Sequence, residues 1–289
     1  MKNNKLILGT VQFGLDYGIN NKYGIPSSNI IKQILDFAMS NGIEILDTAE
    51  AYGISQQRIG QYHQLSKKKF KIITKYCPSN KNLPEAITDR ISKNLKILNV
   101  KNLYSYMFHS YKNYKSFYLL FKDELIKLRK HGLIQKIGVS LHSNDHIKEV
   151  LENSNINIIQ IPFNMLDNAY QRKQILSYAA AKGVEVHTRS VFLQGLFFKN
   201  LNKIDNKFIN LKNGILKIKK IASDEEIGNL ALNYAHSKKY IDKVLVGVDN
   251  LAQLKQNLKY LNNFKNKKLL KEVDKIKIKN NKMLNPSNW

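Results

Sequence analysis

The sequence predicts a single (β/α)8 barrel of the TIM class. Apolar, β-branched runs recur along nearly the whole chain, stretches with helical periodicity lie between them, and eight such runs can be distinguished. Strands that alternate with helices form βαβ units, whose strands are parallel and whose crossovers are right-handed. Eight units of this kind close most simply into a barrel.

The predicted strands are short and fall at fairly regular intervals. They comprise residues 6–9, 43–48, 71–75, 104–109, 136–140, 158–164, 184–192 and 243–249. The first, fourth and seventh fit the strand pattern least cleanly. The clearest helical segments between them are residues 27–42, 83–99, 118–132 and 223–239.

Capping residues support these helices. Segment 27–42 begins with two serines, which are good N-cap residues, and stops at Gly42. Segment 223–239 opens with Ser223 and Glu226, the spacing of a capping box. We therefore expect helices with defined starts and stops.

An open, doubly wound sheet is the alternative fold. It normally binds a nucleotide through a G-x-G-x-x-G turn after the first strand. The glycines in "GTVQFGLDYG" stand at positions 9, 14 and 18, which is a different spacing. The barrel is therefore favoured.

One domain accounts for the whole chain. No linker or tandem repeat interrupts residues 1–289, and a lysine-rich, amphipathic tail, about 265–289, is expected to be helical. The longest interruption, residues 193–214 after the seventh strand, is expected to be a binding loop or lid.

The composition bears on partners and location. The formal net charge is +25, which suggests polyanions, but the excess is lysine spread along the chain. A specific nucleic-acid role is therefore not expected. The single cysteine, Cys77, excludes an internal disulfide and indicates a reducing compartment such as the cytoplasm. No apolar run reaches the length of a membrane span, so we expect a soluble protein.

Polar residues stand where three consecutive predicted strands end. Asp47, Lys75 and His109 terminate the second, third and fourth strands. Neighbouring strands are about 4.8 Å apart, so the three groups are expected within a patch about 10 Å across. Tyr52, in "DTAEAYG", lies on the loop after Asp47 and can fold back over it. Each residue alone has an ordinary structural explanation, such as a helix cap or core packing, but their joint placement indicates a site.

Such a patch suits proton delivery to a carbonyl. A tyrosine is a weak acid at neutral pH, and a nearby ammonium group stabilises the phenolate. Asp47 would hold Lys75 in place, and His109 could orient the substrate oxygen by a hydrogen bond. We find no nucleophile with an adjacent base and no metal-ligand spacing. A hydride from a nicotinamide is the natural attacking group.

At this point the sequence resembles the aldo-keto reductase family over nearly its whole length. The segments "LGTVQFG", "DTAEAYG", "ITK" and "FHS" are similar to the family's motifs, in the same order and with similar separations. The resemblance implies that Asp47, Tyr52, Lys75 and His109 form the catalytic tetrad, with Tyr52 as the general acid in reduction.

The resemblance also implies a cofactor site. Its residues would be Gly9, Thr10, Ser140, Gln160, Arg189, Ser190, Gln194, Gly247, Gln253 and Asn257. In this assignment Ser140 and Gln160 hold the nicotinamide carboxamide, and Arg189 stacks on the ring. Ser190 and Gln194 approach the pyrophosphate, while Asn257 contacts the adenine.

Several positions depart from the family pattern. Leu141 stands where the family often has an asparagine. Gly247, Val248 and Gln253 replace the Lys-Ser pair and the arginine that often bind the 2′-phosphate of NADPH, and Lys255 is a conceivable electrostatic substitute. Family practice favours NADP(H), with NAD(H) open.

The resulting hypothesis is an NAD(P)H-dependent reductase of an aldehyde or ketone, with sugar-derived carbonyl compounds as one candidate class of substrate. The reason for considering a sugar is that the segments "LGTVQFGLDYGI" and "RSVFLQGLF" resemble bacterial branches of the family found with surface-polysaccharide genes. Such a substrate would connect the protein with carbohydrate metabolism. A cofactor-binding regulatory or interaction protein with little turnover is the alternative. The sequence does not name the physiological substrate, the direction of the reaction or the oligomeric state.

Overall fold

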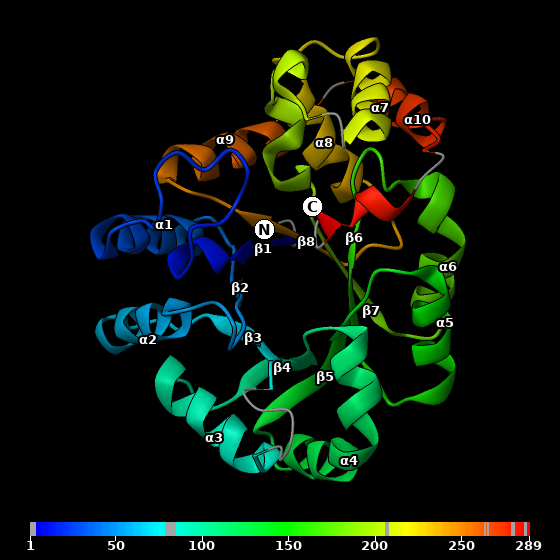
Figure 1. The fold of residues 1–289 in the computed structure, drawn as a ribbon. Helices are drawn as coiled ribbons and strands as arrows, with labels where there is room; N and C mark the ends of the chain where they lie inside the picture. Colours follow the sequence, from blue (N-terminus) through cyan, green and yellow to red (C-terminus); the bar gives the residue numbers. More distant parts are fainter. Residues whose placement is uncertain are drawn as a thin grey trace.

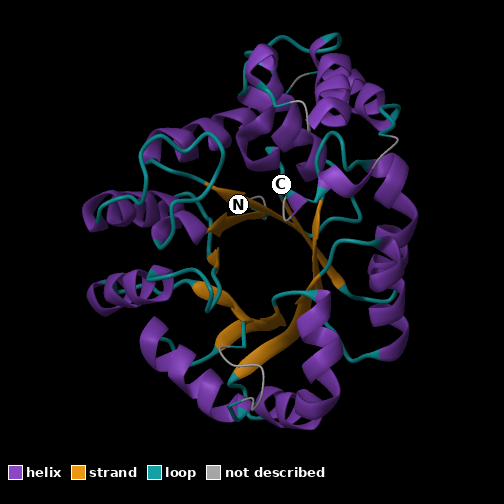
Figure 2. Cartoon of the chain, in the orientation of Figure 1, coloured by secondary structure: helices purple, strands orange, loops and turns teal. Residues whose placement is uncertain are grey.

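The computed structural model is a closed barrel of parallel strands surrounded by helices (Figures 1 and 2). It describes residues 4–78, 85–205, 208–262, 264, 266–278, 281–285 and 288–289. Each strand pairs with the next along the chain, and the last pairs with the first. The strands are β1 (Leu6–Gly9), β2 (Ile45–Asp47), β3 (Lys71–Tyr76), β4 (Leu103–Phe108), β5 (Ile134–Ser140), β6 (Ile158–Pro162), β7 (Glu185–Arg189) and β8 (Lys243–Gly247). The predicted fold class is confirmed.

Each strand is followed by at least one helix on the outside of the barrel (Figure 2). The α-helices are α1 (Ser28–Ser40), α2 (Ser55–Leu65), α3 (Ile87–Leu98), α4 (Tyr111–Lys130), α5 (Asn144–Asn153), α6 (Ala169–Ala181), α7 (Ile209–Lys219), α8 (Ile227–His236), α9 (Leu251–Asn262) and α10 (Lys267–Asp274). Short 3-10 turns are η1 (Val11–Phe13), η2 (Leu193–Phe198), η3 (Leu201–Lys203) and η5 (Asn281–Leu284). No helix among these described parts is long and apolar enough to cross a membrane.

Two apolar clusters stabilise the barrel. The larger lies between the strands and the surrounding helices, and includes the buried stripe of α1. The smaller fills the barrel interior with Ile7, Ile45, Ile73, Met107 and Ile158. Because side chains fill the interior of a TIM barrel, ligands bind outside it, at the carboxyl ends of the strands.

Serine caps set the helix starts. Ser27 accepts a hydrogen bond from the Ile30 amide at the start of α1, as expected. Ser110 does the same for the Asn113 amide, so α4 begins earlier than the sequence pattern indicated. Ser223 and Glu226 bond to each other, but they form a turn, and α8 begins after them.

Residues 193–214 are not a simple loop. Two 3-10 turns occupy its first part, and α7 begins at Ile209. The C-terminal segment is helical only over α10 and the η5 turn in the described residues. It is anchored to the barrel by Asn168, whose Nδ2 donates to the backbone oxygens of Val273 and Ile276 at 2.9 and 2.8 Å.

Candidate active site

A cavity of about 670 Å³ lies at the carboxyl ends of the strands. It is bounded by the β1 and β7 loops and by α9. Nearly all the residues predicted from the sequence line it: Gly9, Asp47, Tyr52, Lys75, His109, Ser140, Gln160, Arg189, Ser190, Gln194, Gly247, Gln253 and Asn257. Thr10 is the exception, and its position is described below.

The strand register brings the polar groups together. Asp47 is the last residue of β2 and lies level with Gly9 of β1 and Ile73 of β3. Lys75 follows two residues further along β3 and therefore points into the same space. His109 comes directly after β4, and its amide donates to the Tyr76 oxygen at 3.3 Å.

Asp47 accepts hydrogen bonds on both carboxylate oxygens. Lys75 donates to Oδ1, and the Nε2 of Gln160 donates to Oδ2 at 2.7 Å. The Lys75 ammonium also donates to the Thr48 backbone oxygen at 3.0 Å. All these groups are buried, so the lysine is fixed in position and its charge is balanced.

Tyr52 lies beside this pair. Its ring centroid is 5.2 Å from the Lys75 ammonium and 5.6 Å from the His109 ring, which it meets edge to face. The Tyr52 loop is held against the β1 loop by two glycines in backbone contact. A Cβ on Gly14 would lie 2.0 Å from the Tyr52 carbonyl oxygen, and one on Gly53 would lie 2.3 Å from the Gly14 oxygen. Glycine is required at both positions.

A second anchor for the same loop is Glu50. Its carboxylate accepts from the Arg90 guanidinium at 2.7 and 2.8 Å, from Asn94 at 2.8 Å and from the Tyr106 hydroxyl at 2.6 Å. It also accepts from the Cys77 amide at 3.1 Å. The loop that carries Tyr52 is thereby tied to β3, β4 and α3.

His109 is neutral at physiological pH. Burial, with the nearby charges of Lys75 and Arg189, lowers its pKa to about 3. A neutral imidazole keeps one N–H, so His109 can donate a hydrogen bond to an oxygen in the cavity.

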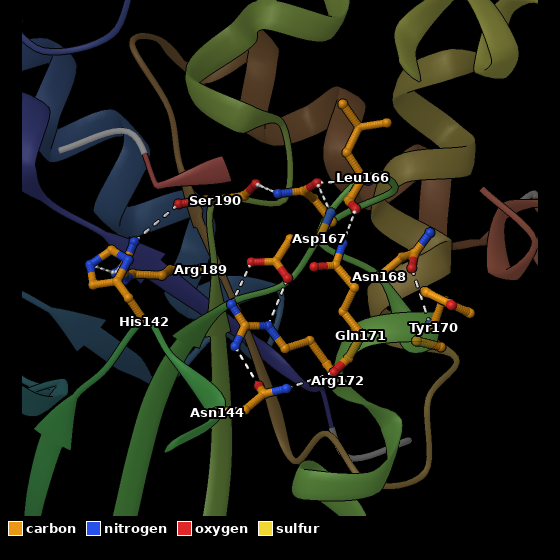
Figure 3. Close-up of polar contacts among 12 residues, drawn as sticks. His142, Asn144, Leu166, Asp167, Asn168, Tyr170, Gln171, Arg172, Arg189 and Ser190 are labelled. Atoms are coloured by element: carbon orange, nitrogen blue, oxygen red, sulfur yellow. Dashed lines mark hydrogen bonds and ion pairs between the residues drawn. The ribbon is translucent and has the colours of Figure 1, made fainter. Parts of the chain in front are cut away.

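Arg189 lies on the opposite wall, against His142 (Figure 3). Its guanidinium donates to His142 Nε2 at 2.6 Å and to the Ser190 hydroxyl at 3.3 Å. Burial and the charges of Arg189 and Arg172 lower the pKa of His142 to about 3, so this imidazole is a neutral acceptor. The nearby Asp167 is bonded instead to Arg172, at 2.6 and 2.8 Å. His142 was not singled out in the sequence.

Two loops meet across the mouth of the cavity. Gln194 donates to the Tyr17 hydroxyl at 3.0 Å, and Asn20 donates to the Gly195 oxygen at 2.5 Å. Ser190, Leu193 and Gln194 all have positive φ, which non-glycine residues seldom adopt. The β7 loop therefore holds a defined conformation beside the β1 loop. Tyr17 and Asn20, which belong to that loop, were also missed by the sequence motifs.

The far end of the cavity is formed by the start of α9. Gly247 ends β8, and Gln253 and Asn257 face the cavity from α9. The side chain of Gln253 is bonded to Asp249: its Oε1 accepts from the Asp249 amide at 2.8 Å, and its Nε2 donates to Oδ2 at 3.1 Å. The Lys255 ammonium lies instead near the Phe37 ring of α1, 5.6 Å from its centroid.

Thr10 and Leu141 are buried in the protein core and do not line the cavity. Thr10 is fully buried, donates to the Asp47 backbone oxygen at 2.9 Å and accepts from Ser55, so it ties β1 to β2 behind the cavity. Leu141 is buried in the outer core.

Solved structures share this fold. The aldo-keto reductase AKR11C1 from Bacillus halodurans in its holo form matches with a TM-score of 0.76 and 20% identity, over 94% of this chain and 91% of that chain. Its apo form matches with a TM-score of 0.69 and 20% identity, over 87% of each chain.

Two curated proteins are related in sequence. The NADH-specific methylglyoxal reductase of Escherichia coli (strain K12) is 26% identical over 178 residues, a span of 54% of each chain, so the match covers about half of that relative. The uncharacterized oxidoreductase YqkF of Bacillus subtilis (strain 168) is 24% identical over 259 residues, 79% of this chain and 81% of that protein.

A sequence model of the Aldo/keto reductase family matches residues 5–278, which is nearly the whole chain. The barrel, the motifs and the relatives agree with that match. The chain belongs to the aldo/keto reductase family and is an oxidoreductase.

Proposed function

We propose that the protein reduces an aldehyde or ketone with a reduced nicotinamide cofactor, and that Tyr52 is the general acid. The observation that carries the proposal is the meeting of Asp47, Tyr52, Lys75 and His109 in one cavity. The cofactor, when bound, supplies the hydride that the carbonyl carbon accepts.

The residues around the cavity fit a dinucleotide. The space runs from the strand ends to Tyr260, nine residues into α9, which is roughly 14 Å along that helix. Gln12 also lines it, with its side-chain amide packed against Gly247, where a Cβ would come within 2.7 Å of Nε2. The absence of a side chain at Gly247 therefore keeps this part of the cavity open.

In the proposed mechanism, Tyr52 donates its proton to the carbonyl oxygen as the carbon accepts the hydride. The tyrosinate that remains is stabilised by the Lys75 ammonium. Asp47 holds Lys75 in place, because it accepts from that ammonium in the buried pair. His109, being neutral, donates a hydrogen bond that orients the same carbonyl oxygen.

The opposite wall would position the nicotinamide. Ser140 and Gln160 lie side by side on β5 and β6, paired in register. Gln160 uses its Nε2 to bond Asp47, which leaves its Oε1 to accept from a carboxamide. Arg189, held by His142, would lie against the ring.

The substrate is proposed only as a class. A relative named for methylglyoxal reduction supports a small reactive aldehyde as the first compound to assay. Sugar-derived aldehydes are the second set, as the sequence suggested.

The test is loss of the near-ultraviolet absorbance of NADH or NADPH in the presence of such aldehydes. Tyr52→Phe should lower kcat by about 10²- to 10⁴-fold, because a general acid contributes that much, while cofactor affinity stays near that of the unmodified protein. Tyr23→Phe removes the same hydroxyl from an exposed residue and should leave kcat unchanged.

Two results would count against the proposal. If the protein binds neither cofactor in calorimetry, the function is refuted. If it binds a cofactor but reduces none of a broad panel of aldehydes and ketones, the regulatory role becomes the better explanation.

A further inference from the structure

We propose that the cavity takes NADH in preference to NADPH, and that Asp249 is the residue that determines this preference. The inference rests on the proposed function, because it concerns the cofactor of the same site. It departs from the family pattern, which favours NADPH.

The adenosine must lie at the α9 end of the cavity. Hydride transfer places the nicotinamide ring beside Tyr52, which protonates the same substrate. The tetrad lies on β2, β3 and β4, and the cavity extends away from it, past Gly247 of β8, to α9. A dinucleotide that begins at Tyr52 therefore ends among the α9 residues.

The charges along the cavity are unevenly distributed. Among the described residues that line it, the Lys and Arg side chains are Lys75 and Arg189, and both belong to the nicotinamide end. At the α9 end, the charged lining residue in the described part of the chain is Asp249. A 2′-phosphate would bring close to two negative charges to this carboxylate. Such like-charge contact disfavours NADPH.

Asp249 is held ready to accept a hydrogen bond. Gln253 bonds to its amide and to Oδ2, at 2.8 and 3.1 Å, and thereby orients the carboxylate. The other oxygen, Oδ1, makes no hydrogen bond to a described residue in the structure and can accept from a ribose hydroxyl. An acidic side chain that accepts from the 2′-hydroxyl is a known chemical solution to NAD recognition.

Among the described residues that line the α9 end of the cavity, no cation takes the place of the missing phosphate ligand. Lys255, the substitute considered from the sequence, directs its ammonium toward Phe37 of α1. Gln253 occupies the position of the usual arginine, and its amide is engaged by Asp249.

The experiment compares the dissociation constants of NADH and NADPH by calorimetry. In the unmodified protein, NADH should bind at least about tenfold more tightly than NADPH, as expected when one ligand brings a like charge to a fixed carboxylate. Asp249→Asn should reduce this ratio mainly by improving NADPH binding. Asp249→Asn combined with Gln253→Arg should reverse it. Asp224→Asn removes the same charge from a residue that does not line the cavity, and should leave the ratio unchanged.

The outcomes separate this inference from the proposed function. Equal affinities, tighter NADPH binding, or a ratio that Asp249→Asn does not change would overturn the role of Asp249, while the reductase proposal would stand. Absence of binding by both cofactors would refute the reductase proposal and this inference with it.

Discussion

Lys75 and Asp47 form an ion pair whose side chains are only 1% and 3% exposed. A buried pair of this kind is costly to desolvate and is maintained by its hydrogen bonds. Here Gln160 and the Thr48 backbone supply the additional bonds. The pair therefore fixes the geometry of the site, and removal of either residue would leave the charge of the other buried without a partner.

Removing one member should be strongly destabilising. Lys75→Met would leave the Asp47 charge buried without its partner, which is expected to cost about 3–5 kcal/mol in the free energy of unfolding. Lys71→Met on the same strand breaks an exposed pair with Glu44 and should cost less than about 1 kcal/mol. Urea unfolding of the two variants checks the difference. Similar losses in both would contradict this account of the pair.

Gly14 should not tolerate even an alanine. Its φ is ordinary, but a Cβ would meet the Tyr52 carbonyl oxygen at 2.0 Å, so the Tyr52 loop must move. Gly14→Ala is expected to lower kcat at least about tenfold, because small misplacement of a reacting group is costly. Gly42→Ala is the control: its φ is +75°, but nothing lies within 4 Å, so it should lose about 1 kcal/mol of stability and keep full kcat. Equal kcat values for the two variants would show that the contact does not position Tyr52.

Glu50 is predicted to position Tyr52 without touching substrate. Every partner of its carboxylate is a donor, so Glu50→Gln would place an NH₂ group against donors and remove the closer of the two carboxylates that pair with Arg90. We expect a loss of about 3 kcal/mol of stability and a lower kcat, with cofactor affinity preserved. Glu272→Gln, which breaks an exposed pair with Lys275, should change neither. A variant of Glu50 with normal kcat at temperatures where it stays folded would limit the residue to a structural role.

The barrel was predictable because its signals are local and repeated. Strands such as β3 and β6 contain adjacent isoleucines, Ile72 and Ile73 in β3 and Ile158 and Ile159 in β6. The segment of α1 carries both its cap and its stop in the sequence. The starts of α4 and α8 were misplaced for physical reasons. Ser110 supplied a cap within an aromatic segment that masked the helical pattern, and the Ser223 hydroxyl donates to Glu226 instead of capping a helix.

The site was predictable where a local motif marks it, at the strand ends, in the Tyr52 loop and at the start of α9. Tyr17 and Asn20 contact residues about 175 positions away along the chain, so sequence spacing contains no information about these contacts. His142 follows β5 by two residues, a position where cavity residues are common, but its importance depends on Arg189 from β7. The conformation of Asp249 likewise depends on how Gln253 folds back on it.

The final prediction concerns pH and the two neutral histidines of the cavity. Both His109 and His142 have a pKa lowered to about 3 by burial first, and then by nearby cations. In the unfolded chain an imidazole titrates near 6.5, so below that pH the unfolded state binds protons that the folded state does not. The contribution of these two histidines to the free energy of unfolding is therefore fully present above about pH 6.5 and is lost as the pH decreases toward 3.

For each such histidine, the free energy of unfolding is lower by about 1.4 kcal/mol at roughly pH 5.5 than at neutral pH. Most carboxylates titrate below this pH range. His142→Gln keeps an acceptor for Arg189 but cannot titrate, so the fall in its unfolding free energy between pH 7.5 and 5.5 should be smaller by about that amount. His131→Gln, at an exposed position, should follow the unmodified protein. Urea unfolding at the two pH values measures the difference. A His142→Gln variant with an unchanged pH response would mean that His142 binds its proton equally well in the folded and unfolded states, so that it is charged at pH 5.5 and Arg189 requires another acceptor there.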